Sequence, residues 1–233
     1  MDTIIGLGGA GCNMVRQFLI YPQYKCYMVD SQERKYEKTL VIPEQENHEL
    51  YEKMNPQVCD FFEDITDNVL FILSGAGRIS GTSLRILEQI HKKTKNINIL
   101  YIKSDMALLS EVGKIQEKVV FSILQEYTRS GVFNRMYIVD NQALEVVVGN
   151  VSVLDYHEQL NSILMSTIHM INVFDHSESV NDTFENPHKT SRIATLGIVD
   201  LQKKQQKMFF SLDNAKEVRY YFAMNEGKLK KSS

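Results

Sequence analysis

The sequence predicts an α/β protein with a doubly wound, mostly parallel sheet, a long central helix and a reduced C-terminal α+β piece. Apolar strand-like runs alternate with helical stretches, as they do when crossover helices join parallel strands. Two glycine-rich turns each lead from a strand into a helix, and Val69–Leu73 is apolar throughout, which suits a central strand covered on both faces. We expect a first domain over residues 1–152, a central helix over 153–174, and a truncated second domain with a tail over 175–233.

The first glycine-rich turn is Gly6-Leu7-Gly8-Gly9-Ala10-Gly11-Cys12-Asn13, between the strand Thr3–Ile5 and a helix that continues over Met14–Ile20. A strand, a glycine turn and a helix in this order direct free backbone N–H groups at a phosphate. Glycine is needed because a Cβ would hold the phosphate away. Gly6, Gly8 and Gly11 also fit the dinucleotide fingerprint, so an NAD- or ATP-using Rossmann-type enzyme is an alternative.

The second glycine-rich turn runs from Ser74 to Ser83, after the strand at 67–73 and before a helix over Leu84–Ile90. Ser80, Thr82 and Ser83 add hydroxyl donors to its backbone amides. Two such turns at the carboxyl edge of one sheet can hold the two ends of a polyphosphate. The alternative for either turn is a tight strand–helix connection without a ligand.

The other elements follow in the order that a doubly wound fold requires. Strand Tyr24–Asp30 ends in Asp30, which can face a ribose or base or can cap a loop. The polar stretch 31–65 predicts a long loop with one short helix near Gln57–Ile65. The remaining predictions are a strand at Asn96–Ile102, a helix at Gly113–Thr128, a strand at Asn134–Asp140, the central helix, a polar loop at 175–191, strands at Ile193–Val199 and Lys207–Leu212, and a terminal helix at Asn214–Glu226.

Composition indicates an ordinary globular protein. The net charge of −3 gives no reason to expect nucleic-acid binding, and no apolar run approaches the roughly 20 residues that span a bilayer. Three cysteines have neither the number nor the spacing of a disulfide framework or zinc site, so we expect no metal site of the protein's own and a reducing compartment. The chain starts directly on a strand without a visible signal peptide, which predicts the cytoplasm.

At the two turns the sequence resembles the tubulin/FtsZ superfamily. Residues 5–15 align without gaps on the FtsZ pattern IGVGGGGGNAV, and Ser74–Ser83 occupies the place of the signature AGMGGGTGTG. Val29–Gln32 is similar to the TDAQ loop, Asn55-Pro56 to the NPE element, and Asp140–Val147 to NDRLLEVV. The resemblance covers residues 1 to about 200.

The resemblance implies a site for GTP or GDP, with Mg²⁺ as a candidate companion ion, in a cytoskeletal, filament-forming protein. The resemblance also implies head-to-tail association of this protein with itself or with a related protein. Asn161 falls where the central helix gives a side chain to the guanine. The full set of implied nucleotide-binding residues is Gly8, Gly9, Ala10, Gly11, Cys12, Asn13, Asp30, Gly75, Gly77, Arg78, Ser80, Gly81, Thr82, Ser83, Asp140, Asn141 and Asn161.

Departures from the pattern predict weak or absent hydrolysis. Arg78-Ile79 replaces two glycines, which either weakens contact with the γ-phosphate or lets Arg78 supply a charge to the phosphates. In the family, the loop NVDFAD brings two acids to a neighbouring subunit's nucleotide. Here Asp182 and Glu185 are each displaced by one residue and are the weak catalytic candidates, and the second domain is short. A non-hydrolysing regulator or capper of a filament-forming relative is therefore a further alternative.

Overall fold

The computed structural model describes residues 1–65, 68–148, 156–177, 190–201 and 203–222. Its centre is a seven-stranded sheet in the order β3-β2-β1-β4-β5-β6-β7, with every neighbouring pair parallel. A separate antiparallel pair joins β8 to β9. The strands are β1 Thr3–Leu7, β2 Lys25–Asp30, β3 Thr39–Val41, β4 Val69–Leu73, β5 Ile97–Lys103, β6 Arg135–Asp140, β7 Ile193–Thr195, β8 Gly197–Asp200 and β9 Gln205–Met208. The predicted fold class is confirmed.

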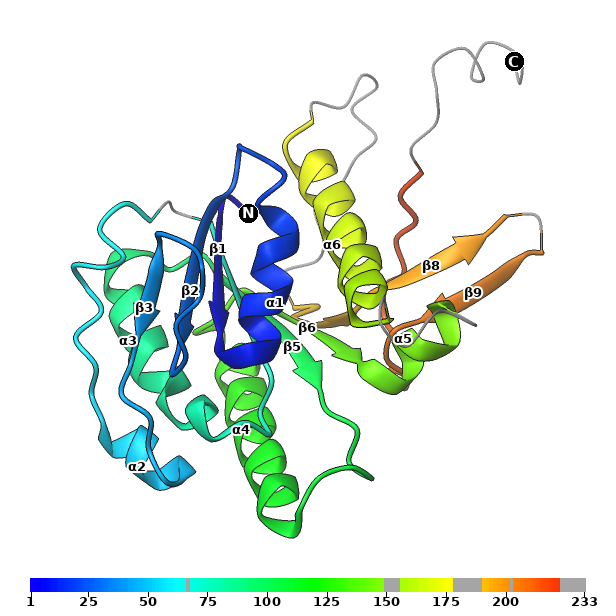
Figure 1. Ribbon diagram of the computed structural model, residues 1–233. Coiled ribbons are helices and arrows are strands. Elements are labelled where there is room, and N and C mark those ends of the chain that lie inside the picture. The colour runs from blue at the N-terminus through cyan, green and yellow to red at the C-terminus, as the bar shows by residue number, and fades with distance from the viewer. Residues whose placement is uncertain (66–67, 149–155, 178–189, 202, 223–233) are drawn as a thin grey trace.

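Helices cover both faces of the sheet (Figure 1). Helices α1, α5 and the long α6 pack on one face, and α2, α3 and α4 pack on the other. No helix of the described ranges has both the length and the apolar character needed to cross a bilayer. The helices are α1 Gly8–Phe18, α2 His48–Lys53, the short 3₁₀ helix η1 Arg78–Thr82, α3 Ser83–Lys93, α4 Glu111–Arg129, α5 Asn141–Val148 and α6 Tyr156–Asp175.

The pleat of the strands divides the core into two layers. Successive side chains of a strand point to opposite faces, so Ile4 packs under α1 and α6 while Ile5 packs on the α3–α4 side. Leu70 and Phe71 of β4 divide in the same way. All of β4 is buried, because both faces of this central strand are covered. This explains the unbroken apolar run in the sequence.

Two predicted helices are wrong. The helix placed near Gln57–Ile65 is absent, and the helix of this region is α2, which begins after the cap Asn47. The described part of the terminal segment, 214–222, is not helical. Its run from Val218 to Phe222 is mostly β-branched or aromatic, and such side chains lose rotamer freedom in a helix.

Other elements also differ from the prediction. Helix α1 begins at Gly8, so most of the first glycine turn is the opening turn of the helix. The short edge strand β3 and helix α5 were not expected. The predicted strand at 193–199 is two strands: β7 extends the main sheet and β8 leaves it to pair with β9.

Glycines bring the start of α1 against the central strands. A Cβ on Gly6 would lie 2.5 Å from the backbone carbonyl of Gly11, and a Cβ on Gly11 would lie 2.4 Å from the carbonyl oxygen of Ile72 in β4. These are backbone contacts, which cannot yield as a flexible side chain can. The opening of α1 is therefore fixed to β1 and β4 at a distance that only glycine permits.

Replacing Gly11 by alanine tests this contact. We expect Gly11→Ala to lower the free energy of unfolding by about 1–3 kcal/mol, because its Cβ overlaps the carbonyl of Ile72. Gly9→Ala is the matched control, since its Cβ would lie 3.6 Å from the nearest atom, on Arg34. The control should be neutral or gain up to about 1 kcal/mol from helix propensity. Urea denaturation of both variants measures the difference, and equal effects would contradict the packing.

Candidate functional site

The two glycine turns lie side by side. Strands β1 and β4 are parallel neighbours with Gly6 opposite Ile72, so both turns leave the same edge of the sheet. The turns also touch, because a Cβ on Gly8 would lie 2.7 Å from Cγ2 of Ile79 in the second turn. Gly8 has a positive φ of 69°, a conformation that favours glycine. The chain thus holds two strand–turn–helix units together at one edge.

The first turn exposes uncapped helix amides. Leu7, at the N-cap of α1, provides no side-chain hydrogen bond, and the first turn of the helix contains no acidic residue. Gly9, Ala10 and Asn13 are exposed to solvent. Free N–H groups and the positive end of the helix dipole stabilise an anion at such a position.

Hydroxyl groups of the second turn face inward. The Ser80 hydroxyl lies 2.7 Å from the carbonyl oxygens of both Gly75 and Gly77, so it braces the loop itself. Thr82 and Ser83 are buried. Gly77 is exposed and a Cβ there would meet little, whereas Gly81 is pressed against the carbonyl of His48. The roles of these residues in nucleotide binding stay predictions.

Arg78 is directed away from the first turn. Its guanidinium pairs with the Glu44 carboxylate at 3.0 Å and donates to the backbone carbonyls of Gln45 and Glu46. Both side chains of the ion pair are 53% exposed, so the pair stabilises the fold little. The adjacent Ile79 packs at Gly8, between the two turns. These are the two positions where the resembled signature has glycine.

Asp30 is engaged by a residue that sequence reasoning missed. Its carboxylate accepts from the Ser31 amide at 2.8 Å and from Nε of Arg34 at 2.7 Å, and Arg34 Nη2 donates to the same oxygen. The Arg34 guanidinium lies against the first turn, 3.6 Å from the Cβ position of Gly9. An acid and an arginine four residues apart after a strand were the available signal. Contact of Asp30 with a ribose or base stays a prediction.

Cys12 is an inert part of the first turn. Its thiol is buried and lies 3.6 Å from the carbonyl oxygens of Gly6 and Val29. Burial, followed by the charge of Asp30, raises the pKa of the thiol to about 12. A thiol with that pKa is protonated at neutral pH and is no nucleophile.

Asp140 and Asn141 lie at the same edge, two strands away from β4. Asp140 ends β6, and its carboxylate accepts from the Gln142 amide at 2.9 Å, where α5 begins. Lys103 of β5 is 4.0 Å from the other carboxylate oxygen. Asp140 therefore acts locally as a helix cap.

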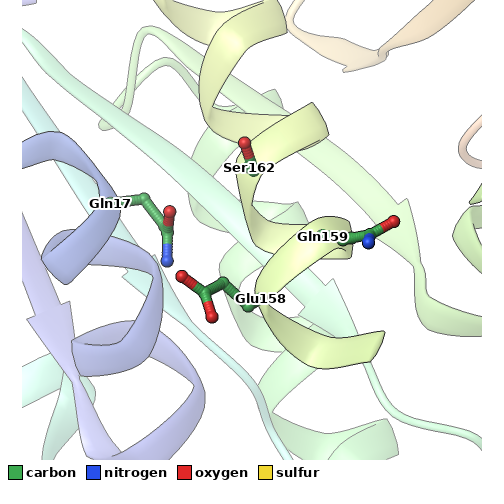
Figure 2. A pocket seen from close by; sticks show the side chains of 4 residues that line it. All are labelled: Gln17, Glu158, Gln159 and Ser162. Atoms are coloured by element: carbon green, nitrogen blue, oxygen red, sulfur yellow. The ribbon is translucent and has the colours of Figure 1, made fainter. Parts of the chain in front are cut away.

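A polar pocket of about 340 Å³ lies between side chains of α1 and α6 (Figure 2). Gln17 of α1 and Glu158 of α6 point toward one another across it, and Gln159 and Ser162 complete the lining. Asn161 is on the same stretch of α6, and Asn13 is one helical turn before Gln17. Residues three or four apart share a helix face, so Asn13 lies on the face of α1 that carries Gln17, and Asn161 lies on the face of α6 that carries Glu158.

The two weak catalytic candidates stay without a structural account. Asp182 and Glu185 lie outside the described residues. Within the part of the chain that is described, no group of three or more His, Cys, Asp or Glu side chains could hold a metal ion.

Glu117 of α4 lies directly beneath the second turn. A Cβ on Gly75 would be 2.1 Å from the Tyr101 hydroxyl and 3.0 Å from the Glu117 carboxylate, so only glycine fits there. The Glu117 side chain is buried, and its carboxylate oxygens have no hydrogen-bond partner among the described residues. Burial raises the pKa of this carboxyl, and the nearby Tyr101 hydroxyl, the backbone of Ser104 and the charge of Lys103 oppose the shift only in part.

Comparison with solved structures shows the fold. FtsZ from M. jannaschii, solved as an empty dimer, matches with a TM-score of 0.62 at 12% identity, over 82% of this chain and 61% of that chain. CetZ2 from Haloferax volcanii, a GTPγS-bound protofilament, gives 0.61 at 14%, over 78% and 61%. TubZ from Bacillus thuringiensis serovar israelensis, a GTPγS-form protofilament, gives 0.59 at 15%, over 78% and 59%. The chain has the tubulin/FtsZ fold.

The match is one of structure. The chain spans less than two thirds of the length of each of these tubulin/FtsZ-fold proteins. A scan against known protein families found no match, and neither did a search of curated proteins. The tubulin/FtsZ fold therefore places the two glycine turns at one edge, while the ligand has to be argued from this chain's own residues.

Glu117→Gln should stabilise the protein in a pH-dependent way. Below the ordinary glutamate pKa the carboxyl is protonated in the folded and in the unfolded protein, so burying it carries no ionisation cost. Because its folded pKa is raised, wild-type stability falls relative to the variant as the pH rises through that value. Thermal unfolding from pH 4 to 8 should show a gap that widens with pH, by about 2–4 °C for each kcal/mol of ionisation cost. A gap of constant size would contradict the buried carboxyl.

Proposed function

We propose that this chain is a divergent tubulin/FtsZ-like protein that binds GTP or GDP between its two glycine turns. The single observation that carries the proposal is the contact of Gly8 with Ile79, which brings two strand–turn–helix units together at neighbouring strands. The uncapped first turn of α1 adds free amides without a competing acid. Such a pair of turns suits a polyphosphate, with one turn at each end.

The polar pocket between α1 and α6 supports the proposal that the base is guanine. Guanine presents its N1–H and exocyclic amine as donors, and amide or carboxylate oxygens accept from them. Glu158 and Gln17 line the pocket with such oxygens, and Asn161 and Asn13 lie on the same two helices. Any Mg²⁺ would be held mainly by the phosphates, since Mg²⁺ commonly keeps waters and phosphate oxygens as ligands.

We further propose head-to-tail association with itself or a relative, with slow or absent hydrolysis, in the cytoplasm. The CetZ2 and TubZ structures with this fold are GTPγS protofilaments. If the next subunit covers the nucleotide, binding and assembly strengthen one another by linkage. Asp182 and Glu185 are the candidate acids for the neighbouring subunit's nucleotide.

A regulator or capper of a filament-forming relative is the second candidate. Ile79 favours it, because this side chain fills the junction between the turns where the resembled signature has glycine. A subunit that binds the γ-phosphate weakly can still attach to the end of a filament, but it does not recruit the next subunit. The two candidates share the nucleotide site and differ in assembly.

Ala10→Asp separates nucleotide binding from folding. Ala10 is exposed in the first turn of α1, where a carboxylate stabilises the helix by about 0.3–1 kcal/mol yet repels a phosphate. We expect at least a tenfold loss of affinity for fluorescent GTP, with an unchanged or higher melting temperature. Ser122→Asp, an exposed position within α4, is the control for added charge and should bind as wild type. Competition by GTP should exceed competition by ATP or NAD; preference for NAD would support the Rossmann-type enzyme instead.

Sedimentation tests the assembly half of the proposal. We expect more protein in the pellet with GTP than with GDP, and phosphate release below about 1 s⁻¹, the low end of enzyme turnover. The double variant Asp182→Asn/Glu185→Gln should lower any phosphate release without changing GTP affinity. Tight GTP binding without sedimentation, together with suppressed assembly of an added relative, would favour the regulator. Absence of nucleotide binding would overturn the proposed function.

A further inference from the structure

We infer that Arg34 binds the phosphate chain of the nucleotide and that Asp30 positions it for this contact. The inference rests on the proposed nucleotide site and adds a cation that the first glycine turn lacks. It assigns to Arg34 the charge that the sequence alone suggested for Arg78.

Hydrogen bonds to Asp30 orient the guanidinium of Arg34. Nε and Nη2 both donate to one carboxylate oxygen of Asp30, and the other oxygen accepts from the Ser31 amide. The Asp30 side chain is only 5% exposed, so the carboxylate that holds the arginine is itself buried. Orientation in advance reduces the conformational entropy that Arg34 would lose on binding a ligand.

Arg34 keeps donors for a ligand. A guanidinium carries five N–H groups, and the two contacts with Asp30 use one on Nε and one on Nη2. No other hydrogen bond joins the guanidinium to a described residue. The side chain is 21% exposed, so its remaining N–H groups have access to solvent and to a ligand. Phosphate oxygens are the acceptors that a guanidinium fork matches best.

Arg34 lies at the side of the first turn that is exposed to solvent. Its Nη2 is 3.6 Å from the Cβ position of Gly9, and Gly9 and Ala10 are neighbouring exposed residues of the turn. The other side, at Gly8, is occupied by Ile79. A phosphate over the exposed amides would therefore lie beside the guanidinium, where amide donors, helix dipole and positive charge act on the same group.

Arg78 cannot act in the same way without leaving its partners. Its guanidinium is paired with Glu44 and with two backbone carbonyls on the side of the second turn that faces α2. The two arginines thus provide a matched comparison: one faces the turn and one faces away from it. Both arginines pair with a carboxylate, so an effect on affinity that comes only from losing an ion pair should appear in both variants.

Four variants test the inference by titration with fluorescent GTP and GDP. We expect Arg34→Met to lose about 10- to 100-fold in affinity for both nucleotides, the range of charged hydrogen bonds. Arg34→Lys should recover part of the loss, because the charge remains while the fork does not. Arg78→Met should lose clearly less affinity than Arg34→Met, because its guanidinium is paired with Glu44. Guanosine, measured by competition, should bind wild type and Arg34→Met equally, because it has no phosphate.

The fourth variant, Asp30→Asn/Arg34→Met, excludes an indirect effect. Arg34→Met leaves a buried carboxylate without its partner, which can distort the turn. The double variant removes that charge, and it should still show the full loss. Recovery of wild-type affinity in the double variant, or equal losses for Arg34→Met and Arg78→Met, would overturn the inference. If wild type binds no guanine nucleotide, the proposed function fails instead, and the two failures are distinct.

Discussion

Close backbone contact between the start of α1 and the central strands is the constraint on which the site depends. Gly6 and Gly11 allow the helix to begin against β1 and β4, at distances where any Cβ would overlap a carbonyl group. That contact fixes the direction of the first-turn amides, and it also brings the turn after β4 within reach of Gly8. A protein with ordinary residues at these positions would have to lift the helix away and would lose the junction of the two turns.

Much of the fold was predictable because the central strands are covered on both faces. Burial on both sides makes a strand such as Val69–Leu73 apolar at every position, and the glycines beside it mark where the chain turns toward a helix. The two turns were predictable for the same reason, since small residues in sequence follow from lack of space in structure. Whether a turn binds a ligand could not be predicted from its glycines. At Gly75 the lack of space comes from the packing of Tyr101 and Glu117.

Elements fixed by distant partners could not be predicted. The amide group of Gln89 in α3 bonds to the backbone of Pro56 and Val58, and turns follow at 59–64 in place of a helix. A local pattern contains no sign of that partner, which lies more than 30 positions away in the chain. Arg34 was missed for a related reason: its spacing from Asp30 is visible in the sequence, but its approach to Gly9 depends on how β2 and α1 pack.

The place of β1 in the sheet has a consequence for how the chain acquires its structure. This first strand pairs on one side with β2, which follows soon after it, and on the other with β4, through Thr3 and Val69. During synthesis, the second edge of β1 stays open until the chain has been extended past residue 73. Because such distant pairing is slow, the nascent protein presents an apolar strand edge, a template for unwanted association, throughout that interval.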